Sequence, residues 1–122
     1  MRFIDQLYTV DGHTIVDDTT SQYMITLNSG HPVYKAHFPG HPVTPGVVEL
    51  QIVSELLALH MGRRLHPREY VNVKYLAVLS PVEVPEVSVL ITAMQLPDAS
   101  TKVSAAITSG DTTFVKLSAV YE

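Results

Sequence analysis

Residues 46–61 read GVVELQIVSELLALHM, and this segment decides the fold. Its apolar residues recur on almost every face of a helix, which indicates a helix buried inside the molecule. Thr44 is predicted to be the N-cap, Pro45 suits the first helical position, and Gly62 suits the C-terminal stop. The segment is shorter than a membrane span and contains ionisable residues, so we do not expect it to cross a membrane.

Strands are predicted on both sides of this helix. Residues 20–27 alternate in side-chain character, as a strand does. Four more strands are expected after the helix, at 70–79, 84–96, 101–108 and 112–121. Their short connections favour an antiparallel meander. Together these elements make an α+β fold of one domain, residues 1–122, in which the sheet must wrap around the helix to bury it.

Composition excludes several classes of protein. Eight Lys and Arg against 12 Asp and Glu give a net charge of −4, which disfavours nucleic-acid binding. Cysteine is absent, so disulfides and thiolate metal sites are excluded. The first residues lack the apolar run of a signal peptide, and no long apolar stretch occurs. We therefore expect a cytoplasmic protein without a membrane partner.

Residues 37–46 read HFPGHPVTPG. This segment resembles the active-site loop of the hot-dog-fold 3-hydroxyacyl-acyl-carrier-protein dehydratases, in which the final Pro-Gly opens the central helix. Elsewhere the resemblance extends over most of the chain in element order and pattern only. It implies the hot-dog fold, an antiparallel sheet wrapped around one central helix. It also implies dehydration of 3-hydroxyacyl thioesters to trans-2-enoyl thioesters, in fatty-acid or related lipid or polyketide biosynthesis.

The chemistry of dehydration fits the residues of this loop. The reaction needs a base near C2, an acid near the C3 hydroxyl and a donor that polarises the thioester carbonyl. His37 suits the base, because neutral imidazole accepts a proton near pH 7. The family assigns the carbonyl contact to the glycine at position 46, whose amide has no acceptor within the helix. Phe38, Pro45 and Val47 are expected to contact the substrate beside it.

The chain departs from the family pattern on the central helix. Fourteen positions after the histidine the family has Glu or Asp, whereas this chain has Gln51, and an amide cannot donate a proton as an acid does. One turn later the family usually has Gln, and here Glu55 occurs. Positions i and i+4 share a helix face, so we predict that Glu55 takes over part of the acid's role while Gln51 contacts the substrate. Glu49 is a weaker substitute, because two residues turn a helix by about 200°.

Histidines near the motif raise the question of a metal. His31 and His41 lie in the same irregular segment as His37, and three histidines could hold zinc. The resembling family uses no metal, and no carboxylate lies between these histidines. We therefore predict neither a metal nor a cofactor.

The resemblance also implies partners. In the family two chains pair sheet edge to sheet edge, and each site takes its histidine from one chain and its helix residue from the other. We thus expect a homodimer or a multiple of dimers. The acyl group would arrive on an acidic carrier protein or on coenzyme A. A basic cluster could dock the carrier or simply be a solvated helix end, and it consists of Arg63, Arg64, His66 and Arg68.

Three functions remain open from the sequence. The first is the dehydratase. The second is a hot-dog acyl thioesterase, in which Glu55 would activate water. The third is a non-catalytic subunit that binds acyl chains or pairs with an active partner, which the Gln51 substitution favours.

Overall fold

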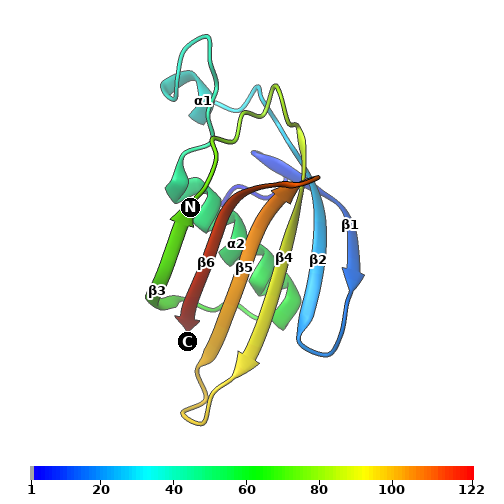
Figure 1. Cartoon of the computed structure of the whole chain (residues 1–122), viewed down its shortest axis with the longest axis vertical. Coiled ribbons are helices and arrows are strands. Elements are labelled where there is room, and N and C mark those ends of the chain that lie inside the picture. Colours follow the sequence, from blue (N-terminus) through cyan, green and yellow to red (C-terminus); the bar gives the residue numbers. More distant parts are fainter. Residues whose placement is uncertain (1) are drawn as a thin grey trace.

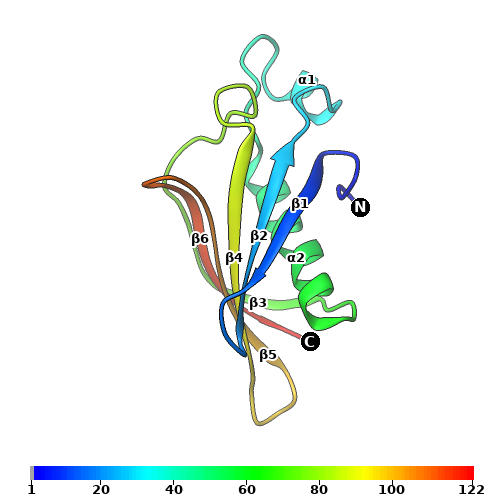
Figure 2. The same cartoon turned by 90° about the vertical axis from the view of Figure 1, so that its right-hand side faces the viewer.

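The computed structural model describes residues 2–122, in which a six-stranded antiparallel sheet curves around one long helix (Figures 1 and 2). This confirms the predicted α+β class and the hot-dog arrangement. The elements in chain order are β1 Tyr8–Ile15, β2 Thr20–Leu27, α1 Val33–Ala36, α2 Gly46–Met61, β3 Pro67–Tyr75, β4 Glu86–Gln95, β5 Thr101–Ser109 and β6 Thr112–Tyr121.

Helix α2 ends where the sequence predicts, but its N-terminal cap differs. Gly62 ends the helix in the left-handed conformation, with φ of 70°, as expected for a glycine stop. The N-cap is Pro45, not Thr44, so the helix begins one residue later than predicted. The Thr44 hydroxyl is engaged elsewhere, in a 3.0 Å hydrogen bond with the Tyr34 hydroxyl. That contact ties the preceding loop to the start of the helix.

The sheet covers only one side of α2. The buried residues of the helix are Val48, Glu49, Ile52, Val53, Leu56 and Leu57. In contrast, Val47 is 71% exposed and Leu59 is 52% exposed. The prediction that α2 is buried on every side is therefore wrong for a single chain, and its outer side is free to meet another surface.

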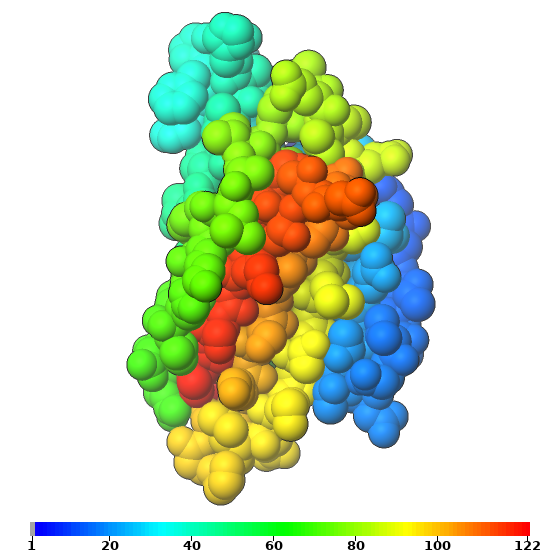
Figure 3. All heavy atoms as spheres, in the orientation of Figure 1, coloured from blue at the N-terminus to red at the C-terminus, as the bar shows by residue number. Residues whose placement is uncertain are grey.

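Strand order also differs from a simple meander. The order is β1-β2-β4-β5-β6-β3, so β4, β5 and β6 form the expected meander while β3 pairs with the far side of β6. The strand expected at 70–79 ends earlier, at Tyr75. Residues 76–85 instead cross the end of the sheet beside the loop that precedes α2, where the Thr44 amide donates to the Leu79 carbonyl at 2.8 Å. Figure 3 shows these two segments at the same end of the molecule.

Two short elements have no counterpart in the sequence predictions, namely strand β1 and helix α1. Strand β1 is an edge strand with a bulge between Val10 and Gly12, and most of its residues are exposed or half-buried. Within residues 2–122, neither helix has the length and apolar content that a membrane span requires.

Candidate active site

The loop with the histidine motif folds back on itself ahead of α2. The Val43 amide donates to the His37 carbonyl at 2.9 Å, and the backbones of Phe38 and His41 exchange two hydrogen bonds in a tight turn. The peptide bond between His37 and Phe38 is cis. The His37 side chain is exposed and stacks on the Phe38 ring, with 4.8 Å between ring centroids. The imidazole is thus open to an incoming molecule while its backbone is held.

Gly46 opens α2, and a tyrosine fills the space beside it. A Cβ added to Gly46 would lie 2.6 Å from Cζ and 2.7 Å from the hydroxyl oxygen of Tyr75, closer than real side chains approach. In the structure the Tyr75 ring occupies that side of Gly46, so the position excludes a side chain even before substrate binds.

Gln51 and Glu55 are in direct contact, as their spacing of four residues on α2 predicts. Gln51 Nε2 donates to Glu55 Oε2 at 3.1 Å. Glu55 also accepts three hydrogen bonds from the start of the chain. These come from the Phe3 amide at 2.7 Å, the Ile4 amide at 2.8 Å and the Tyr8 hydroxyl at 2.8 Å. Burial and then the Glu55 carboxylate raise the pKa of Tyr8, which keeps this phenol a donor.

Glu55 is therefore an anchor for residues that lie far away in the sequence. Its two oxygens receive four donors, and donating a proton to a substrate would require one of these contacts to break. No sequence pattern pointed to this role, because the contacts span 47 to 52 residues.

Replacing Glu55 by glutamine is expected to lower the free energy of unfolding by about 1–3 kcal/mol, because the new amide nitrogen would face donors that the carboxylate now accepts. Urea unfolding of both proteins measures this difference. Glu83→Gln is the matched control, since Glu83 is exposed and its removal should change the stability by less than about 0.5 kcal/mol. Equal stability of the Glu55 variant and the parent would contradict an anchoring role.

Glu49 was predicted to be only a weak substitute for the acid, but its surroundings in the structure are unusual. Its side chain is only 3% exposed, and its Oε1 atom is the one buried side-chain polar atom within residues 2–122 that lacks a hydrogen-bond partner. Burial raises the pKa of Glu49 to about 8. The available signal was its spacing, because position 49 shares a helix face with position 46 and lies among apolar positions.

The other predicted substrate contacts lie around the start of α2. Pro45 is half-buried at the N-cap, while Phe38 and Val47 are 55% and 71% exposed. The neighbouring histidines do not join His37. His41 is exposed, and His31 Nδ1 accepts a hydrogen bond from the Val33 amide at 3.1 Å. In the described part of the chain no three His, Asp or Glu side chains are grouped so as to hold a metal ion.

A groove of about 480 Å³ runs along the open side of α2. Gln51 and Glu55 line its α2 side, and apolar and basic side chains line the rest. The apolar lining residues include Ile4, Ala58, Leu59, Leu65 and Tyr70, and the basic ones are Arg2, Arg64 and His66. An acyl chain and an anionic group could both be accommodated by this lining.

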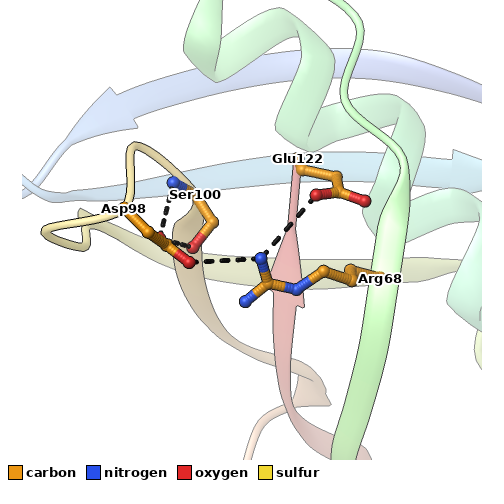
Figure 4. Close-up of polar contacts among 4 residues, drawn as sticks. All are labelled: Arg68, Asp98, Ser100 and Glu122. Carbon is orange, nitrogen blue, oxygen red and sulfur yellow. Dashed lines mark hydrogen bonds and ion pairs between the residues drawn. The ribbon is translucent and has the colours of Figure 1, made fainter.

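Arg68 belongs to a different charge network from the rest of the predicted basic cluster. Its Nη1 lies 3.2 Å from Asp98 Oδ2 and 3.7 Å from Glu122 Oε2 (Figure 4). Hydrogen bonds from the Ser100 hydroxyl and amide, and then the Arg68 guanidinium, lower the pKa of Asp98 to about 2. The positive charge of Arg68 is thus balanced locally, which leaves Arg63 and Arg64 as the exposed cations of the cluster.

Comparison with known proteins identifies the family. The family model of the ApeI dehydratases matches residues 13–115, which is most of the chain. The chain belongs to the ApeI-like dehydratase family. No curated protein sequence is significantly similar to it. The ApeI-like assignment agrees with the histidine loop at the start of α2, which lies within the matched residues.

Solved structures share the fold of this ApeI-like chain at low sequence identity. The dehydratase heterocomplex ApeI:P from Xenorhabdus doucetiae has a TM-score of 0.67 at 14% identity, covering 93% of this chain and 96% of that one. An uncharacterised protein from Erwinia carotovora subsp. atroseptica has a TM-score of 0.64 at 21% identity, covering 95% and 94%. A mutant thioesterase from Pseudomonas aeruginosa has a TM-score of 0.60 at 13% identity, covering 89% and 77%. Hot-dog dehydratases and thioesterases both occur among these neighbours.

Proposed function

We propose that this protein dehydrates 3-hydroxyacyl thioesters to trans-2-enoyl thioesters. The observation that carries the proposal is an exposed His37 on a loop whose other end begins α2 at Gly46. The histidine supplies a base, and the first turn of the helix supplies amide donors without acceptors. Membership of the ApeI-like family supports this class of reaction.

In the proposed reaction the neutral His37 imidazole removes a proton from C2. The thioester carbonyl is polarised by the Gly46 amide, where the helix dipole favours the negative charge that develops on oxygen. The C2–H electron pair then forms the double bond as the C3 hydroxyl leaves. The loop contains Pro39, Pro42 and Pro45, whose fixed φ angles restrict its conformations. The base is therefore held in place before substrate binds.

We assign Gln51 to a polar contact with the substrate and Glu55 to the orientation of Gln51. The 3.1 Å hydrogen bond between the two side chains supports this division of roles. The catalytic part that Glu55 plays beyond this orientation stays a prediction.

We propose that the substrate is carried by acyl carrier protein, or alternatively by coenzyme A, and that the enzyme acts in the cytoplasm. The groove beside α2 suits such a substrate, because its apolar residues can hold the acyl chain and Arg2, Arg64 and His66 can meet an acidic carrier or a phosphate. This proposal includes no cofactor and no metal.

The working unit is proposed to be a homodimer, or a multiple of dimers, that pairs through β3. Strand β3 is an edge of the sheet, and nearly all of its residues are exposed. The open side of α2 lies next to this edge, so a second copy there would cover both. The ApeI relative forms a heterocomplex, which makes pairing with a different chain the alternative.

Replacing Val71 by aspartate is expected to convert the dimer to monomers at micromolar concentration. Val71 lies in β3 and is 59% exposed, and two carboxylates buried across a strand pair would repel each other. Sedimentation velocity measures the change. Ile15→Asp is the control, because Ile15 is 72% exposed on β1, the opposite edge of the sheet. A parent protein that sediments as a monomer would contradict the homodimer.

The function is tested by incubating the protein with 3-hydroxyacyl-carrier protein of several chain lengths and following product masses. A dehydratase produces a loss of water from the acyl group, which stays on its carrier. A thioesterase releases the acyl group and leaves the free carrier thiol. A non-catalytic subunit produces neither change alone, and the dehydration proposal fails if no acyl length loses water.

A further inference from the structure

Glu49 occupies the turn of α2 that directly follows Gly46. Its amide donates to the Pro45 carbonyl at 3.1 Å, so it belongs to the first turn of the helix. Residues three apart share a helix face, which places the carboxyl on the side of α2 where Tyr75 covers Gly46. The Gln51 and Glu55 pair lies on a different face, along the groove.

Burial of the Glu49 carboxyl lowers the stability of the fold. Glu49 forms no ion pair in the described part of the chain, where the ion pairs are those of Arg68. Its Oε1 atom is buried without a hydrogen-bond partner. A buried acceptor left unsatisfied destabilises a protein, and native structures keep few such atoms. Sites that break packing rules in this way are often functional.

The surroundings of Glu49 favour its neutral form near pH 7. Burial raises the pKa of Glu49 to about 8. The ionisable side chains on which the Glu49 charge acts include the phenols of Tyr34 and Tyr75. The pKa of each phenol is raised, first by burial and further by the Glu49 charge. Both phenols are therefore neutral near pH 7 and supply no charge that would ionise the carboxyl. An acid whose pKa is close to the working pH transfers protons efficiently.

We propose that Glu49 is the general acid that protonates the leaving hydroxyl group. This inference rests on the proposed dehydration. His37 takes the C2 proton, the C2–H electron pair forms the C2–C3 double bond, and the C3–O bond breaks. The oxygen takes the proton of the Glu49 carboxyl and leaves as water. Glu49 is then a carboxylate and His37 an imidazolium, and transfer of that proton through solvent restores both groups.

Tyr75 lies near this carboxyl, because the Glu49 charge helps to raise the pKa of the Tyr75 phenol. Its ring is 52% exposed and lies directly against Gly46. The role assigned here is the one that the sequence gave to Glu55, whose two oxygens are instead occupied by four donors.

Glu49→Gln tests the proposal, because the amide has nearly the shape of the neutral acid but no proton to give. We expect kcat to fall by about 10²–10⁴-fold with little change in KM. The wild-type kcat should decline above about pH 8, as the acid ionises, and the residual activity of the variant should lack this decline. Glu83→Gln, at an exposed site, should behave as the parent.

A stability measurement supplies a readout that is independent of activity. The carboxyl is ionised above about pH 4.5 in the unfolded chain but only above about pH 8 in the folded one. Unfolding therefore releases a proton between these values, so the parent should lose stability as pH rises from about 4.5 to 8. Glu49→Gln should lose less over the same range. Glu49→Asp, which keeps an acid, should retain the alkaline decline in rate at a reduced kcat.

The outcomes separate the two proposals. A Glu49→Gln enzyme with a rate within threefold of the parent overturns the acid role, and so does an unchanged alkaline decline. If the Gln variant does not fold, the pH profile of the parent decides, and a parent kcat that stays level above about pH 8 overturns the role. If His37→Ala loses activity while Glu49→Gln stays active, the proposed dehydration stands and only the acid role of Glu49 is rejected. A parent that releases no water from any 3-hydroxyacyl thioester overturns both.

Discussion

Replacing His37 by alanine should lower the rate of dehydration by about 10²–10⁴-fold, the range typical of losing a general base. The His37 imidazole is exposed and stacks on the neighbouring Phe38 ring, so an incoming substrate can reach its ring nitrogens. Steady-state assays with 3-hydroxyacyl-carrier protein, followed by mass spectrometry, measure the loss.

This variant should leave the fold unchanged. His37 is exposed, and the contacts that hold its loop are made by the backbone and by the pair of Tyr34 and Thr44. Equal melting temperatures of variant and parent would show that the loss is chemical. His41→Ala is the matched control, four residues further along the same loop, and it should keep nearly full activity. A His37→Ala enzyme that retained the parent's rate would end the proposed mechanism.

The parts of the fold that the sequence predicts well are those set by local patterns. Strand β2 has the predicted bounds and helix α2 ends at the predicted residue, because alternation and helical periodicity act within each segment. Strand β1 escaped prediction because most of its residues are exposed or half-buried and a bulge at Gly12 breaks the register. The position of β3 beside β6 depends on the path of residues 76–85, which connect β3 to β4. No local sequence pattern predicts that path.

The same division applies to the candidate site. The motif located His37 and Gly46, and helical spacing predicted the contact between Gln51 and Glu55, which the structure confirms. The anchoring of Glu55 by the first residues of the chain could not be predicted, because it joins segments about 50 residues apart. Burial of Glu49 is likewise a property of the assembled fold.

A second large effect is expected at the start of α2. Gly46→Ala should lower the dehydration rate by about 10²-fold, because its methyl group would meet the Tyr75 ring at 2.6 Å and force the ring or the helix start to move. A shift of about 1 Å in a catalytic group can reduce a rate by this amount. The measurement is kcat/KM of the variant against the parent on one substrate.

Tyr75→Ala separates two reasons for having glycine at position 46. If the methyl group acts by displacing the Tyr75 ring, Gly46→Ala should have little further effect once that ring is absent. The double variant should then lie within about fivefold of Tyr75→Ala, and the double-mutant cycle should show strong coupling between the two positions. We expect this result, since the ring is the nearest group to the missing Cβ. A full 10²-fold loss in the Tyr75→Ala background would instead mean that the methyl group obstructs the thioester itself, so that the glycine is required for the approach of substrate to the helix amide.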